Sequence, residues 1–245
     1  MLKLNDDKTE FMVITSPHLK HHMYPISLLV EDVTISPSDS VRNLGVIFDS
    51  QMSMSSHVKS LCTNLNFQLR NISRIRRFLD YDTCHLVTRA IILSRRDYCN
   101  GLLLGSAKTD IQKLQRIQNW AAKVICQALK RDHATPYLHQ LHWLPVEDGV
   151  TFKILVLVFK CLNGTAPDYL SQCLSLHIPT RQGLRSTADT TRLSEHNSTK
   201  TLISFEKRTF SYTAPRIWNS LPVIIRESTT LPAFKKSLKT HLFPA

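Results

Sequence analysis

Glycine is scarce in this sequence of 245 residues, which contains only 6 of them. A Gly-rich loop that cradles phosphate groups needs several glycines close together, and no such loop occurs. The chain has 6 cysteines but no Cys-x-x-Cys pair, although structural zinc sites usually carry one. No apolar run reaches the ~18 residues that span a bilayer. These absences argue against a P-loop protein, a zinc-ribbon protein and a membrane-spanning protein.

The beginning of the sequence also lacks the features of a secretory leader. Residues 1–7 contain no apolar stretch and end in two aspartates, so we expect an intracellular protein, cytoplasmic or nuclear, with no membrane partner. In a reducing compartment the widely spaced cysteines are expected to be free thiols, mostly buried in helices.

Acidic residues are few and unevenly placed. The chain has 31 Lys and Arg against 19 Asp and Glu, a net charge of +12. Residues 1–48 hold 4 basic and 6 acidic groups, whereas residues 59–131 hold 14 basic and 4 acidic groups. Such a concentration is expected of a protein that meets a polyanion. The alternative is a solvated basic face that serves solubility.

Hydrophobic periodicity predicts strands in the first fifty residues. Residues 41–49 fit one strand of period two with Gly45 in its middle. A continuous apolar strand is expected at 11–15, and a hairpin at 26–30 and 33–35. Four short strands offer too little core to stand alone, so we expect them to pack on something else.

Helical periodicity dominates the rest of the chain. The first three helices are expected at about 53–78, 80–100 and 109–128, as a bundle. Further helices are expected to begin at Thr135, Val146, Pro167 and Thr230. The stretch 179–204 has few large apolar groups and is expected to be a long loop or weak strands.

The predicted fold class is α+β, mainly α. A short antiparallel β part over 1–50 precedes a helical bundle over 51–132. A helical C-terminal region over 133–245 completes the chain and contains the loop 179–204.

Three site hypotheses find little support in spacing. The pair Asp6-Asp7 lies before Lys8 in a turn-like segment and fits a turn signal better than a two-metal site. A Cys–His nucleophile has no distinguishing pattern. A zinc site would have to be built from histidines and a cysteine that lack the short spacing usual for zinc ligands, and we expect no metal. The candidate groups are His18, His21 and His22, or His133, His139 and His142 with Cys126.

A cluster of arginines is the strongest chemical signal. Phosphate contacts need cations on a rigid face, and nearby aromatic rings can stack on bases; Phe67 and Phe78 flank the cluster, and Arg89 adds a further cation. The competing interpretation is a solvated helix end. We predict nucleic-acid contacts for Arg70, Arg74, Arg76, Arg77, Arg95 and Arg96.

Six motifs in order carry a family resemblance. They are Leu4-Asn5-x-x-Lys8-Thr9-Glu10, Val41-Arg42-Asn43-Leu44-Gly45-Val46, Arg95-Arg96-Asp97-Tyr98-Cys99-Asn100, Leu114-Gln115-x-x-Gln118-Asn119, Leu141-His142-Trp143-Leu144-Pro145 and Ala214-Pro215-x-x-Trp218-Asn219-Ser220-Leu221-Pro222. Together they resemble the C-terminal half of the reverse transcriptase, an RNA-directed DNA polymerase, of non-LTR (LINE, jockey/CR1-like) retrotransposons. The resemblance covers essentially the whole chain.

The resemblance implies roles for particular segments. Residues 1–49 would be the end of the polymerase palm, with Lys8 near the incoming nucleotide and Leu44 and Gly45 in the hairpin that grips the primer. Residues 51–131 would be the thumb, which contacts the template–primer duplex of RNA and DNA. Residues 133–245 match the C-terminal region of the family.

One departure limits the expected activity. The family's Tyr/Phe-Ala-Asp-Asp box does not occur in this sequence, and polymerases hold their catalytic Mg²⁺ through such carboxylates. We therefore expect a truncated polymerase fragment that binds nucleic acid, has no catalytic residue or cofactor of its own, and would join an upstream palm and fingers segment. The alternatives are a helical protein-interaction module, a non-functional element remnant, or a hidden Cys/His enzyme.

Overall fold

The computed structural model describes residues 9–15, 26–30, 33–177, 191–195 and 208–243. Two small antiparallel sheets precede a series of helices, so the protein is mainly α with a minor β part, as the sequence predicts. Lys8 and most of the expected loop 179–204 lie outside the described residues.

Two hairpins form the β part. Strands β1 (Leu28–Val30) and β2 (Val33–Ile35) pair as predicted. Strands β3 (Ser40–Asn43) and β4 (Val46–Asp49) also pair with each other, so the single strand expected over 41–49 is wrong. The chain reverses at Leu44 and Gly45, whose φ angles are 47° and 82°. Positive φ at both central residues is the geometry of the tight type I′ hairpin turn.

The strand expected over 11–15 is not formed as a strand. This segment nevertheless lies beside the second hairpin, because Ser38 N–H donates to Phe11 O at 2.8 Å and Thr15 N–H donates to Ser50 O at 3.1 Å. Its backbone polar groups are therefore partly satisfied without a regular ladder.

Three helical arms follow the hairpins. Val58, Leu65, Leu69 and Ile72 bury one face of the first arm, as their spacing of three, four and seven predicts. Asp80 caps the second arm by accepting a hydrogen bond from Thr83 N–H. The first arm consists of α2 (Ser55–Ile75) and the 3₁₀ turn η2 (Arg76–Phe78). The second arm consists of α3 (Tyr81–Thr88), the π turn η3 (Arg89–Leu93), α4 (Ser94–Asp97) and the 3₁₀ turn η4 (Asn100–Leu103). The third arm is α5 (Lys108–Ile125).

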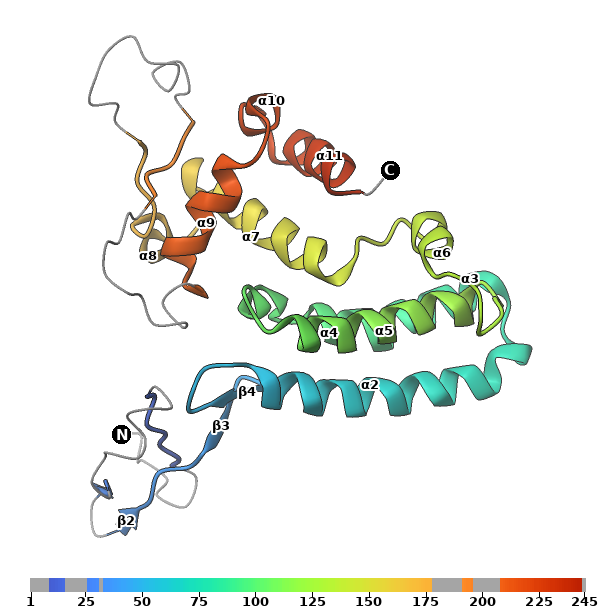
Figure 1. Ribbon diagram of the computed structural model, residues 1–245, viewed down its shortest axis with the longest axis horizontal. Coiled ribbons are helices and arrows are strands. Elements are labelled where there is room, and N and C mark those ends of the chain that lie inside the picture. Colours follow the sequence, from blue (N-terminus) through green and yellow to red (C-terminus); the bar gives the residue numbers. More distant parts are fainter. Residues whose placement is uncertain (1–8, 16–25, 31–32, 178–190, 196–207, 244–245) are drawn as a thin grey trace, which may run out of the picture.

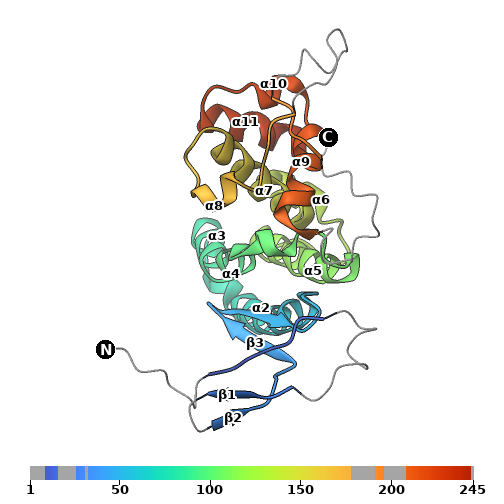
Figure 2. The same ribbon diagram turned by 90° about the vertical axis from the view of Figure 1, so that its left-hand side faces the viewer.

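The C-terminal region continues the helical stack. Helices α2, α5, α7 and α11 lie one above the next (Figure 1), and the hairpins lie beside the start of α2, at the end of the stack away from α11 (Figure 2). The further elements are α6 (Thr135–Gln140), α7 (Val146–Leu162), α8 (Asp168–Ser171), α9 (Phe210–Asn219), α10 (Val223–Arg226) and α11 (Leu231–Leu242).

Helix α7 belongs to both hydrophobic cores. Val146 and Val150 join the core of β4, α2, α3 and α5. Leu155 and Phe159 join a second core with α9 and α11. Because α6 and the start of α7 complete the first core, the packing does not divide at residues 132 and 133, and the proposed domain boundary stays a prediction.

The cysteines are free, as expected, but only half of them are buried. Cys62, Cys84 and Cys161 are buried, whereas Cys99 and Cys173 are exposed. Within the ranges that the structure describes, no helix is both long and apolar enough to cross a bilayer.

Candidate nucleic-acid interface

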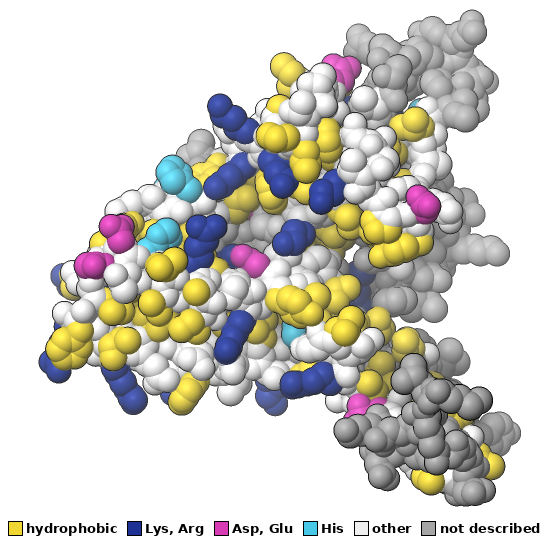
Figure 3. Space-filling model, turned by 180° about the vertical axis from the view of Figure 1, so that it is seen from behind, with side chains coloured by type: hydrophobic (Ala, Val, Ile, Leu, Met, Phe, Trp, Pro, Cys, Tyr) yellow, Lys and Arg dark blue, Asp and Glu magenta, His cyan; other side chains and the backbone are white. Residues whose placement is uncertain are grey.

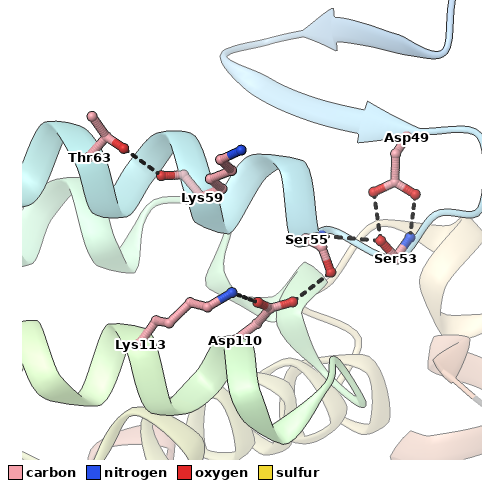
Figure 4. Close-up of polar contacts among 7 residues, drawn as sticks. All are labelled: Asp49, Ser53, Ser55, Lys59, Thr63, Asp110 and Lys113. Atoms are coloured by element: carbon pink, nitrogen blue, oxygen red, sulfur yellow. Dashed lines mark hydrogen bonds and ion pairs between the residues drawn. The ribbon is translucent and has the colours of Figure 1, made fainter.

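Helices α2 and α5 run side by side in the same direction, and a polar contact ties their first turns together (Figure 4). Ser55 Oγ donates to Asp110 Oδ2 at 2.6 Å, and Lys113 Nζ donates to Asp110 Oδ1 at 2.8 Å. Burial raises the pKa of Asp110, but the hydrogen bonds from Lys113 and Ser55 and the Lys113 charge outweigh burial, so this pKa lies below its ordinary value. Asp110 is therefore a buried anion that joins the two helices.

The loop that enters α2 is fixed in the same region. Asp49, the last residue of β4, accepts hydrogen bonds from Ser53 N–H at 2.8 Å and from Ser53 Oγ at 2.9 Å (Figure 4). Ser53 Oγ in turn accepts from Ser55 N–H at 3.2 Å. These bonds set the direction in which α2 leaves the hairpin.

Arg76 ties the other ends of the two helices together. Its Nε donates to Val124 O and its Nη2 donates to Ile125 O, both at 2.8 Å, and its Nη1 donates to Leu79 O at 2.6 Å. The carbonyls at the end of α5 have no partner within the helix, and a cation is favourable there. The guanidinium of Arg76 is therefore used by the fold, and its predicted phosphate contact stays a prediction.

A groove, here called the α2–α5 groove, follows the seam between the tied ends. It consists of two adjoining hollows of about 560 and 790 Å³, both of which are lined by Arg116 and Trp120. Among the described residues no acidic side chain lines it, because the nearby Asp110 is 2% exposed and faces inward. The basic side chains in the groove are Lys59, Arg76, Lys113, Arg116, Lys123 and Lys130.

Three of the predicted arginines extend this basic surface along α2 and η2. Arg70, Arg74 and Arg77 are exposed. Arg70 follows the groove residue Asn66 by four positions, and Arg77 follows the groove residue Ser73 by four, so both lie beside the groove on the helix surface.

Exposed aromatic rings accompany the arginines on α2 and η2. Phe67 is 60% exposed in a hollow that it shares with Lys59 and Thr63, and Phe78 is 73% exposed. The guanidinium of Arg77 lies 4.6 Å from the centroid of the Phe78 ring. Rings with open faces beside cations are suited to stacking on bases.

Arg95 and Arg96 do not join the groove. Arg95 is exposed on α4, where its Nη1 donates to Asn64 Oδ1 of α2 at 2.7 Å. The Arg96 side chain is only 11% exposed and pairs with Asp97 at 2.8 Å. The cluster of six arginines in the sequence is thus divided among the groove side of α2, a helix end and α4.

The predicted primer-side hairpin meets another of the six motifs. Leu44 is 82% exposed at the tip, and its carbonyl oxygen accepts a hydrogen bond from Tyr98 Oη at 2.9 Å. A Cβ atom on Gly45 would lie 3.8 Å from the Tyr98 ring. The tip therefore has a fixed position near α4, and its contact with a primer stays a prediction.

Two other motifs also contact each other. Gln118, which is fully buried, donates through Nε2 to Leu144 O at 2.8 Å, and Gln115 Oε1 accepts from Val146 N–H at 2.8 Å. The glutamines of α5 thus fix the segment that enters α7, so these motif residues act within the fold.

Sequence reasoning missed the contribution of α5 to the groove. Lys113, Arg116, Lys123 and Trp120 are not among the residues for which the sequence predicts nucleic-acid contacts. Their positions at i, i+3, i+7 and i+10 form one stripe, which is the signal that could have identified them. The stripe alone does not reveal that α2 lies beside it.

The metal and Cys–His hypotheses gain nothing from the geometry. In the part of the chain that the structure describes, no three His, Cys, Asp or Glu side chains are grouped to hold a metal ion. His133, His139 and His142 form no such group with Cys126, while His18, His21 and His22 lie outside the described residues.

Comparison with known proteins gives no relative. No protein-family model, no curated protein and no solved structure matches this chain.

Proposed function

We propose that this protein binds a nucleic-acid duplex through the α2–α5 groove and the arginines beside it. The observation that carries the proposal is an open groove between two parallel helices, lined by cations and, in its described lining, by no acidic side chain. Lys59, Arg70 and Arg116 would contact phosphates, while Phe67 would stack on an unpaired base at the edge of the duplex.

The length of the basic surface fits a polymer. Lys59 and Arg77 are eighteen residues apart on α2 and its 3₁₀ extension, which corresponds to about 27 Å at the rise of an α-helix. This is the length of roughly eight base pairs at 3.4 Å per step. A chain of phosphates can therefore contact several of these cations at once.

We further propose that the duplex is the RNA–DNA template–primer of a reverse transcriptase, with α2 to α5 as the thumb-like part. This assignment rests on the six motifs that resemble non-LTR retrotransposon polymerases and on the agreement between the thumb-like segment and the basic groove. Because no Ala-Asp-Asp box occurs in the sequence, the proposal is one of binding, and neither polymerisation nor a Mg²⁺ site is assigned to these residues.

Removing one cation in the groove and one beside it tests the proposal. We expect Arg70→Ala with Arg116→Ala to weaken the binding of a fluorescent DNA–RNA duplex roughly 10- to 100-fold in an anisotropy titration, because two charge-assisted phosphate contacts are lost. Lys235→Ala with Lys236→Ala removes the same charge from the exposed face of α11 and is the matched control. Equal weakening by both pairs would contradict a site in the groove.

The N-terminal hairpins favour a second candidate, docking on another polypeptide segment such as a polymerase palm. Leu28 of β1 and Val33 of β2 are 43% and 46% exposed on one face of the hairpin, and Leu29 is 70% exposed on the other; exposed apolar surface of this kind often marks an interaction site. Co-purification of the chain with a separately expressed palm segment, and loss of that complex on Leu29→Lys, would support this candidate.

A further inference from the structure

A second basic hollow shares no lining residue with the groove. This cleft, here called the α3–α7 cleft, has a volume of about 440 Å³ between the second helical arm and the start of α7. Figure 3 shows Lys and Arg side chains gathered in the middle of one face of the molecule, between the α2 layer and the C-terminal helices. The cations that line the cleft are Arg89, Arg96, Lys153 and Lys239.

Four elements bring these cations together. Arg89 begins the π turn η3, Arg96 lies on α4, Lys153 on α7 and Lys239 on α11. The π turn widens the helix at the wall of the cleft, and such turns are frequent at functional sites. Asp97 is the acidic residue in the described lining, and Arg96 already neutralises it through contacts at 2.8 and 2.9 Å. The cleft therefore keeps a net positive charge.

Buried polar atoms without partners also mark the cleft. Arg96 uses Nε and Nη2 for Asp97, but its buried Nη1 has no hydrogen-bond partner within the described part of the chain. The same holds for His85 Nε2 and Asn100 Oδ1, and all three residues line the cleft. Buried polar groups normally find partners, so a ligand with oxygen and nitrogen atoms would satisfy what the protein leaves open.

The lining of the cleft also contains aromatic and apolar side chains. The Trp143 ring stacks on His85 with a centroid separation of 6.1 Å and an interplanar angle of 29°. Phe152 and Leu141 add apolar surface. A lining that combines cations with flat apolar surface is what a molecule with both phosphate groups and a ring requires.

We propose that the α3–α7 cleft binds a small phosphorylated ligand of mononucleotide size. Its phosphates would contact Arg96, Lys153 and Lys239, and its base would lie against Trp143. The volume is within the range of small-molecule pockets and is too small for a duplex. This site does not depend on duplex binding in the groove, because the two sites share none of their lining residues.

Calorimetric titration of the full chain with adenosine diphosphate tests the proposal. We expect saturable binding that Lys153→Ala with Lys239→Ala weakens at least about tenfold, since two contacts to phosphate are lost. Lys236→Ala is the control, because Lys236 is exposed on the same helix as Lys239 but outside the cleft. Arg96→Lys keeps the charge without the planar fork and should also weaken binding. The groove variant Arg70→Ala with Arg116→Ala should leave it unchanged.

The outcomes separate the possible ligands. Absence of saturable binding, or equal affinity in the Lys153/Lys239 and Lys236 variants, would overturn the proposal. Adenosine that binds as tightly as the diphosphate would contradict the phosphate contacts. Pyrophosphate that binds as tightly as the diphosphate would contradict the role of Trp143 and identify a site for inorganic phosphates instead.

Discussion

The ends of the α2–α5 pair and the groove between them use the same kinds of side chain in different ways. At the ends, Asp110 and Arg76 are satisfied by the protein itself through short hydrogen bonds. In and beside the groove, the charged groups of Lys59, Arg70 and Arg116 have neither an ion pair nor a hydrogen bond to any other described residue. The basic residues of the sequence are therefore of two kinds: some stabilise the fold, and others remain available to contact a ligand.

The largest expected effect is at Arg76. Arg76→Ala removes three hydrogen bonds to backbone carbonyls and should lower the free energy of unfolding by about 3 kcal/mol, measured by urea denaturation. Arg76→Lys should recover little of this loss, because lysine has no planar fork. If Arg76→Ala unfolded at the wild-type urea concentration but lost duplex affinity, Arg76 would belong to the ligand site and not to the helix end.

Asp110 should have the next largest effect. Asp110→Asn replaces a buried anion that holds Ser55 and Lys113, and we expect a loss of about 2 kcal/mol in unfolding free energy at pH 7. Because the pKa of Asp110 is lowered in the folded protein, its contribution is present above the unfolded pKa of about 3.9 and is lost as pH falls through the folded pKa. The difference in unfolding free energy between the wild-type protein and Asp110→Asn should thus narrow from pH 7 toward pH 3. A difference that does not depend on pH would refute the ionic contact.

Arg77 should behave in the opposite way to Arg76, because its substitution should affect duplex binding more than stability. The side chain of Arg77 is exposed and lies over the ring of its neighbour Phe78. Arg77→Ala should therefore change the unfolding free energy by no more than about 0.5 kcal/mol. Duplex affinity should fall about fivefold, which corresponds to about 1 kcal/mol. Anisotropy and urea denaturation on the same preparation measure both. If Arg77→Ala were less stable than Arg76→Ala, the distinction between cations that hold the helix ends and cations that contact the ligand would be wrong.

The smallest expected effect concerns His57, which holds the second hairpin against α2. Ile47 N–H donates to His57 Nδ1 at 3.4 Å, and burial, followed by the charge of Arg42, lowers the pKa of His57. A lowered pKa gives stability that is present above about pH 6.5 and is lost as the pH falls. Between about pH 7 and pH 5.5 the unfolding free energy of His57→Asn should therefore fall less than that of the wild-type protein, as measured by urea denaturation at each pH. Identical pH profiles for the two proteins would exclude this role.

Local patterns predicted most of the helices. Helices α2, α5 and α11 have clear amphipathic stripes, and α11 also has a cap, Thr230, whose side chain accepts from Ala233 N–H. Helix α9 was not predicted because Pro215 normally disfavours a helix interior by about 3 kcal/mol. The burial of Trp218, whose Nε1 donates to Thr191 O at 2.8 Å, favours the helix in spite of the proline.

The hairpin and the groove depended on information that local patterns lack. Leu44 is an unusual residue for a turn position with positive φ, so the β3–β4 region resembled one strand. Arg76 and Arg77 are neighbours with similar local sequence, yet only Arg76 faces the end of α5. Which cation is available was decided by the packing of α2 on α5, a contact between residues about fifty positions apart.

The salt dependence of duplex binding tests the central claim most directly. For phosphate contacts the logarithm of the binding constant should fall linearly with the logarithm of salt concentration, by about 0.9 per contact. We predict a steep slope for the wild-type protein and a slope smaller by about 1.8 for Arg70→Ala with Arg116→Ala, with no change for the Lys235 and Lys236 control. A flat wild-type slope, or the same slope in the groove variant, would contradict the account.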